Sequence, residues 1–124
     1  MIKGKLEDRQ GAIADYTEAI RINQNWSSRS ILDAYNNRGI AKSELGNNQG
    51  AIADYNEAIR LNPKFASAYY NKACAYSLQN NLELALSNLQ KAIQLSPERY
   101  RQLAKTDKDF SNIRREARFQ KLLR

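Results

Sequence analysis

The sequence contains no histidine, one cysteine, two prolines and five glycines among its 124 residues. Histidine is the commonest general acid or base and the commonest zinc ligand, so its absence removes the usual basis of both kinds of site. The single cysteine, Cys74, cannot form an internal disulfide, and we therefore predict a reducing compartment, the cytoplasm.

Long hydrophobic stretches are also lacking. No segment approaches the roughly 20 apolar residues that cross a bilayer, and Met1–Lys5 leads directly into charged sequence, unlike a signal peptide. Helix breakers are few, whereas Ala, Leu, Gln, Glu, Lys and Arg are frequent and favour helix. The sequence therefore predicts one soluble, helical domain without a membrane span.

Positive charge is concentrated near the C-terminus. The formal net charge is +7, but residues 1–97 carry 11 Lys and Arg against 9 Asp and Glu, a balance of only +2. Residues 98–124 carry 9 against 4 and supply the other +5. An electrostatic attraction to a partner would therefore start from this segment.

One segment occurs nearly twice. Residues 11–23 (GAIADYTEAIRIN) recur as residues 50–62 (GAIADYNEAIRLN) with 11 of 13 positions identical, and residues 84–96 form a looser third copy. A 34-residue interval separates the matching alanines of the second and third copies, Ala51 and Ala85, whereas a 39-residue interval separates Ala12 from Ala51. A period of this size indicates a repeat architecture.

Each repeat is predicted to be a pair of helices. Residues 34–41 match residues 68–75 at the same offset, and short polar turns follow at 46–48 and 79–81. Gly and Asn in these turns tolerate the left-handed backbone that ends a helix. Within the second helices apolar residues recur at helical spacing, and such a stripe is buried only when neighbouring pairs stack.

The 34-residue period, the Tyr-x-x-x-Gly/Ala opening of the first helices, the later alanines and the closing Pro63 and Pro97 resemble the tetratricopeptide repeat. The resemblance implies an all-α fold, an α-solenoid (right-handed superhelix) of antiparallel helix pairs with a C-terminal capping helix segment. It divides the single domain 1–124 into a partial repeat at 1–26, full repeats at 32–65 and 66–99, and a cap at 100–124.

Three features depart from the family's pattern. The first repeat lacks its first helix, so the chain is cut from a longer protein or begins with an orphan helix, and Met1–Gln10 holds only a last helical turn and a loop. The 39-residue interval predicts a longer loop or an extended helix start around Trp26–Ile31. Arg38 and Lys42 occupy positions that the family usually fills with apolar side chains, and we expect their stems to pack while their charges reach water.

The C-terminal segment is predicted to cap the last repeat. A short helix is expected over about 97–105, and Asp107 is a candidate N-cap for a further helix with its apolar residues on one face. The basic residues of this segment form either an anion or nucleic-acid patch or the solvated face of the cap, and we favour the latter because no nucleic-acid-binding motif accompanies them. These residues are Arg114, Arg115, Arg118, Lys121 and Arg124.

No catalytic, cofactor-binding or metal-binding motif is found, so we predict a protein that is not an enzyme and needs no cofactor. Cys74 has no histidine to activate it and is interpreted as a packing or groove-lining residue. The acidic residues at 15 and 18, and at 54 and 57, are interpreted as the solvated outer face of the second helices, near Arg21 and Arg60.

In the family that the chain resembles, the first helix of each pair lines the concave face, and this implies a groove that holds a peptide or helix of a partner protein. Tyr70 is the best single anchor, because aromatic residues carry much interface energy; Asn37 and Asn71 have helix packing as an equal alternative. The predicted groove residues are Asp33, Asn36, Asn37, Ile40, Tyr70, Asn71, Cys74 and Ser77.

The predicted function is therefore a protein–protein interaction module, or scaffold. Two alternatives remain. The chain could form a homo-oligomer, since Ile13, Tyr16 and Ile20 lack their usual partner helix within it. It could also bind anions or nucleic acid through the basic C-terminal helices, which we consider the weaker alternative.

Overall fold

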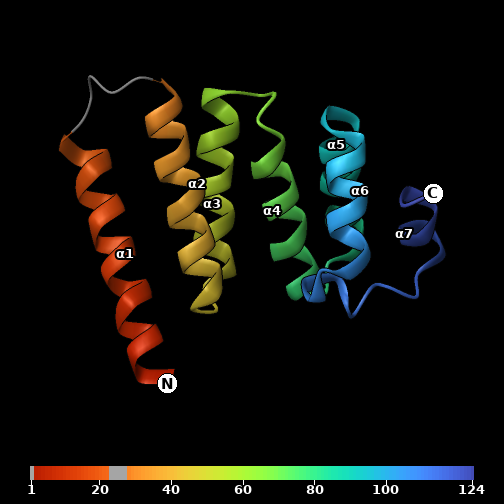
Figure 1. The fold of residues 1–124 in the computed structure, drawn as a ribbon, viewed down its shortest axis with the longest axis horizontal. Coiled ribbons are helices and arrows are strands. Elements are labelled where there is room, and N and C mark those ends of the chain that lie inside the picture. The colour runs from red at the N-terminus through yellow and green to blue at the C-terminus, as the bar shows by residue number, and fades with distance from the viewer. Residues whose placement is uncertain (1, 23–27) are drawn as a thin grey trace. The chain divides into compact units, whose positions relative to one another are not determined.

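The computed structural model describes the backbone of residues 2–22 and 28–124 and the side chains of residues 8–22 and 30–124. The regular elements in these ranges are all helical (Figure 1), and none of the described helices is long and apolar enough to cross a membrane. The chain divides into two compact units, Met1–Pro63 and Lys64–Arg124. The predicted all-α fold of paired helices is confirmed.

The N-terminal unit contains α1 (Ile2–Ile22), α2 (Ser28–Glu44) and α3 (Asn48–Leu61), with α2 packed against both of the others. We expected a loop within residues 1–10, and this prediction is wrong. Helix α1 runs without interruption from Ile2. This stretch has no proline and is rich in helix-forming residues, so nothing in it stops a helix.

The extended helix start expected before α2 is observed from Ser28, so α2 is 17 residues long. Trp26, which the same prediction placed in the longer loop or the extended helix start, lies outside the described residues. The added helical residues account for part of the longer interval between the first two repeat copies.

The same turn joins both helix pairs. Gly46 and Asn80, which occupy equivalent places in the two full repeats, have left-handed φ angles of 87° and 60°. The next residue in each turn, Asn47 or Asn81, caps the following helix by accepting a hydrogen bond from the backbone N–H three residues on. The predicted roles of Gly and Asn in these turns are thus confirmed.

Small residues allow the paired helices to approach. A Cβ atom added to Gly39 on α2 would lie 2.6 Å from Cε1 of Tyr55 on α3, so only glycine fits there. In the next repeat the equivalent positions hold Ala73 and Leu89, both fully buried. The smaller residue, Gly39, thus faces the larger side chain, Tyr55, and the larger residue, Ala73, pairs with the smaller side chain, Leu89. The packed volume is therefore similar in the two repeats.

The C-terminal unit contains α4 (Ala66–Leu78), α5 (Leu82–Leu95), α6 (Pro97–Thr106), the 3₁₀ turn η1 (Lys108–Phe110) and α7 (Ala117–Leu122). Helices α4 and α5 form the second repeat pair, α6 and α7 pack against α5, and η1 packs against α4. Phe110, Ile113 and Phe119 from the last segment are buried in the same core as α4 and α5.

The predicted cap is only partly right in its local structure. Asp107 is an N-cap, but its side chain accepts a hydrogen bond from the Asp109 N–H at the start of η1, not at the start of a long helix. A turn at residues 111–115 then separates η1 from α7. This break lets Phe110 and Phe119 both reach the core, with ring centroids 5.3 Å apart.

Candidate partner-binding site

Four predicted groove residues share one face of α2, because Asp33, Asn36, Asn37 and Ile40 follow at helical spacing. Asn36 is buried, Asp33 and Ile40 are half-buried, and Asn37 is exposed. Two of them border a hollow of about 260 Å³ between α1 and α2. Its lining residues are Asp8, Arg9, Ala12, Tyr16, Asn37, Ile40, Ala41 and Glu44.

This hollow offers both polar and apolar groups. Tyr16 and Ile40 supply apolar surface, and Asn37 supplies an amide that can donate to and accept from a peptide backbone. Arg9 and Glu44 also line the hollow, and Arg9 Nη2 lies 3.4 Å from Glu44 Oε2 in an exposed ion pair. The hollow thus combines apolar surface, an amide and an ion pair within the N-terminal unit.

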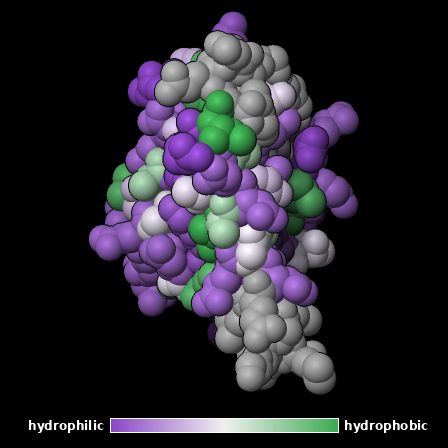
Figure 2. Space-filling model, turned by 90° about the vertical axis from the view of Figure 1, so that its left-hand side faces the viewer, coloured by the Kyte–Doolittle hydropathy of each residue, from purple (hydrophilic) through white to green (hydrophobic). Residues whose placement is uncertain are grey.

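The side of the N-terminal unit that α1 presents is largely hydrophilic (Figure 2), and its hydrophobic residues lie in small separate patches. Ile13, Tyr16 and Ile20 are half-buried, and α1 packs against α2. These three residues are therefore less exposed than the missing partner helix led us to expect. Oligomerisation through them stays a prediction.

Arg38 and Lys42 are less exposed than predicted, with 16% and 21% of their side chains in contact with solvent, because both pair with Asp54 on α3. Arg38 donates two hydrogen bonds to the Asp54 carboxylate, at 2.9 and 2.7 Å, and Lys42 Nζ lies 3.2 Å from it. The Asp54 side chain is only 5% exposed. The bonds to Asp54 raise the pKa of the Arg38 guanidinium.

Asp54 was also expected on the solvated face, and this prediction is wrong. The buried ion triad instead ties α2 to α3, and Arg38 Nη1 donates to Thr17 Oγ1 of α1 at 3.1 Å. The triad and the bond to Thr17 therefore hold α2, the helix that carries the predicted groove residues. The interpretation of Glu18 and Glu57 as outer-face residues is confirmed, because they pair with Arg21 and Arg60, and these pairs lower the pKa of both carboxyls.

On α4 the structure covers most of the predicted groove residues. Tyr70, Cys74 and Ser77 are buried, with exposed fractions of 6%, 7% and 0%, and Asn71 is half-buried. Their cover includes the chain's own segment 107–112, which we call the cap segment. As long as this segment is in place, a partner has little access to the three buried residues.

Tyr70 is held by contacts on its ring and on its hydroxyl. The ring stacks on Tyr100 at a centroid distance of 4.9 Å and meets Phe110 edge-on at 5.7 Å. The hydroxyl donates to Asp107 Oδ2 at 2.8 Å. Tyr70, which the sequence predicted as an anchor for a partner, thus contacts the cap segment through its hydroxyl and its ring.

Ser77 extends the attachment by another turn of α4. Its hydroxyl donates to the Asp109 carbonyl at 2.7 Å, and the Asn112 amide donates to the Ser77 carbonyl and to Asn80. The cap segment is therefore bound along α4 by both main-chain and side-chain hydrogen bonds.

Cys74 lies beneath the same segment, with Sγ 3.8 Å from Asp107 Oδ2. Burial, followed by the negative charge of Asp107, raises the pKa of the Cys74 thiol, and burial also raises the pKa of Asp109. The ligand atoms of Cys74, Asp107 and Asp109 lie within 4.8 Å of one another. The protonated thiol is favoured, and Asp107 already accepts hydrogen bonds from Tyr70 and the Asp109 N–H. We therefore interpret the cluster as a hydrogen-bonded contact that holds the cap segment on α4.

Two of the C-terminal arginines make contacts within the C-terminal unit. Arg114 donates to the carbonyls of Ala104 and Lys105 in the last turn of α6, and to the carbonyl of Asp107, which follows that helix. Arg118 pairs with Glu83 of α5 at 2.6 Å. These contacts favour the interpretation of the basic segment as part of the cap.

Two family models match the chain. One, described as TPR repeat, matches residues 41–79, and the other, described as tetratricopeptide repeat, matches residues 66–99. No curated protein matches the chain. Repeats of this kind are generally protein–protein interaction modules and typically non-catalytic scaffolds. The matched residues, the 34-residue period and the repeated helix pair with its left-handed turn identify the chain as a member of the tetratricopeptide repeat family.

Proposed function

We propose that the chain is a scaffold that holds a peptide or helix of another protein in its groove, mainly on the α2 face. The observation that carries this proposal is the hollow between α1 and α2, where Asn37 and Ile40 lie beside Tyr16. An amide between two apolar side chains matches a peptide ligand, whose backbone needs hydrogen bonds and whose side chains need apolar contact.

The contacts of the cap segment in the C-terminal unit also support the proposal that a first helix of this fold binds a peptide. It lies on the face of α4 where the groove was predicted, and it forms the contacts that a bound peptide would form. An aromatic side chain, Phe110, packs against Tyr70, and a backbone carbonyl, that of Asp109, accepts from Ser77. Within the C-terminal unit this face is already occupied, which leaves Asn71 as the half-buried member of the set.

The proposed compartment remains the cytoplasm, because the only thiol of the chain is unpaired and buried. The partner is proposed to be a protein, and the proposal contains no cofactor and no catalytic step.

The proposal is tested with peptides selected from a displayed library against the purified chain. Their affinity is measured by fluorescence anisotropy with the wild type and with the Asn37→Arg variant, which fills the hollow from an exposed position without disturbing the core. We expect the variant to bind at least about tenfold more weakly, the effect of losing a central contact.

The matched control is Asn56→Arg, which adds the same side chain at an exposed position of α3 outside the hollow. This variant should bind like the wild type. If Asn37→Arg binds the selected peptides as tightly as the control does, the α2 face is not the binding site.

A further inference from the structure

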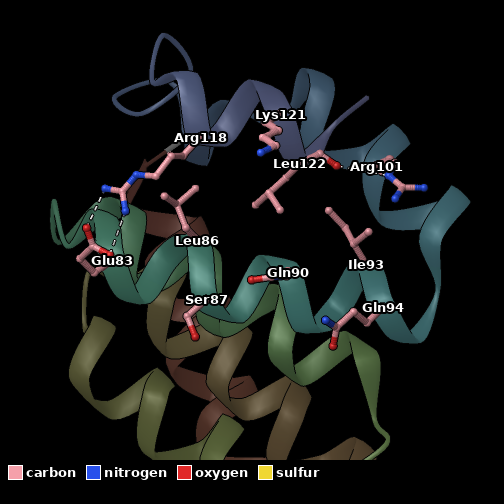
Figure 3. A pocket seen from close by; sticks show the side chains of 10 residues that line it. All are labelled: Glu83, Leu86, Ser87, Gln90, Ile93, Gln94, Arg101, Arg118, Lys121 and Leu122. Carbon is pink, nitrogen blue, oxygen red and sulfur yellow. Dashed lines mark hydrogen bonds and ion pairs between the residues drawn. The ribbon is translucent and has the colours of Figure 1, made fainter.

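A larger hollow lies within the C-terminal unit, where α6 and α7 meet α5 (Figure 3). Its volume of about 560 Å³ falls in the range of roughly 300–1,000 Å³ that is usual for ligand sites. Leu86 and Ile93 of α5 and Leu122 of α7 point into it and form an apolar lining. Leu86 and Ile93 are two helical turns apart, so this lining extends for about 10 Å along α5.

The rim of the hollow is cationic. Arg118 and Lys121 project from α7 and Arg101 from α6, whereas Glu83 is the single acidic residue of the lining. Glu83 is already engaged by Arg118, and Arg101 uses Nε to donate to the Leu122 carbonyl at 3.2 Å. Among the described residues no carboxylate pairs with Lys121, whose side chain points toward the hollow in Figure 3.

We propose that this hollow binds a peptide segment of a partner protein in which apolar side chains are flanked by carboxylates. The apolar lining takes the central side chains, and the ammonium group of Lys121 and the terminal nitrogens of Arg101 take the carboxylates. Gln90 and Ser87 on α5 supply an amide and a hydroxyl for the peptide backbone. Apolar contact then gives affinity, and charge complementarity gives orientation and selectivity.

The lining argues against nucleic acid as the occupant. The ten residues that line the hollow include no aromatic side chain. Proteins that bind single-stranded nucleic acid stack bases on aromatic rings beside their cationic groups, and this hollow has only the cations. Leu86 and Ile93 are only 8% and 5% exposed, so a peptide side chain would contact them along the edges that line the hollow.

This site lies beyond the proposed function, since it uses α5, α6 and α7 of the C-terminal unit and none of the α2 residues. The two proposals can therefore fail separately. A protein with Asn37→Arg keeps the hollow on α5 intact, and a variant of the hollow keeps the α2 face intact.

The probe is a fluorescein-labelled synthetic peptide with two adjacent leucines flanked on each side by two glutamates, titrated with the full chain and followed by anisotropy. We expect saturable binding that weakens as the sodium chloride concentration rises, because the contacts include exposed ion pairs. A peptide with serines in place of the leucines, and one with lysines in place of the glutamates, should each bind at least about tenfold more weakly.

Two substitutions locate the site. Lys121→Glu reverses the unpaired charge of the rim, and Gln90→Glu adds a carboxylate to the exposed surface of α5 at the hollow, where glutamate is a good helix former. Each is expected to weaken binding of the acidic peptide about tenfold. The control Lys105→Glu makes the same change in net charge as Lys121→Glu, at an exposed position of α6 outside the hollow, and should leave the affinity unchanged.

Three results would overturn the proposal. Binding could be lost equally with Lys105→Glu, which would make the attraction a property of the net charge. The serine peptide could bind as tightly as the leucine peptide, so that the apolar lining plays no part. A short single-stranded RNA could displace the peptide and bind more tightly than it, which would assign the cations of the hollow to nucleic acid.

Discussion

Replacing Phe110 by alanine is expected to lower the free energy of unfolding of the C-terminal unit by about 3–5 kcal/mol, the usual cost of removing a buried aromatic ring. Phe110 is fully buried and contacts both Tyr70 and Phe119 through its ring. It thus connects the cap segment to α4 and to α7, and its loss leaves a cavity that these elements cannot fill without moving. Urea unfolding followed by circular dichroism measures the change.

The control for Phe110 is Leu103→Ala on α6, where 44% of the leucine is exposed. Much of that side chain remains in water in the native state, so its removal should cost well under half as much. Similar losses from the two substitutions would mean that the cap segment is not packed on α4.

Replacing Asp54 by alanine is expected to destabilise the N-terminal unit by about 3–5 kcal/mol, because it leaves two cations near the interior without their counter-ion. The side chains of Arg38 and Lys42 are only 16% and 21% exposed, and both pair with Asp54. The loss should appear as a lower urea midpoint, and the helix content of the native state should stay unchanged.

Glu57 provides the matched control on the same helix. It pairs with Arg60, but the side chains of this pair are 33% and 68% exposed, so the solvent screens their attraction. Glu57→Ala should hardly change the midpoint. If Asp54→Ala and Glu57→Ala have the same effect, the triad does not stabilise the unit.

The parts of the fold that could be predicted from the sequence are those set by local chemistry. Gly46 and Asn80 end helices because their backbones adopt the left-handed conformation, and Asn47 and Asn81 begin the next helices as caps. Each of these roles depends on neighbours within a few residues, so the 34-residue period was enough to find them.

The burial of Asp54 could not be predicted in the same way. Within its own helix it looks like Asp15, at the same place in a nearly identical segment, which is exposed. The difference arises on the preceding helix, α2, from which Arg38 and Lys42 both reach the Asp54 carboxylate. One signal in the sequence could have indicated that Arg38, Lys42 and Asp54 interact. All three differ in the next repeat, where the equivalent residues are Lys72, Tyr76 and Asn88.

The cover over the α4 residues of the predicted groove could not be predicted for a similar reason. The spacing of Tyr70, Cys74 and Ser77 correctly places them on one face of α4, but their cover comes from the cap segment, which follows only after α5 and α6. The local pattern at Asp107 predicted a helix cap and gave no information on which surface the following residues would meet. The density of large apolar residues in a short basic tail, at Phe110, Ile113 and Phe119, was the signal that this tail belongs to the core.

The reactivity of Cys74 tests most directly whether the cap segment closes the α4 face. The rate of its reaction with an aromatic disulfide reagent is measured at pH 8 on the native protein and on the protein unfolded in urea. Because the only thiol lies beneath Asp107 and its pKa is raised by burial, we predict that the native protein reacts at least about 100-fold more slowly. Phe110→Ala should recover much of the lost rate. A native thiol that reacts as fast as the unfolded one would contradict the account, because the α4 face would then be open to a partner.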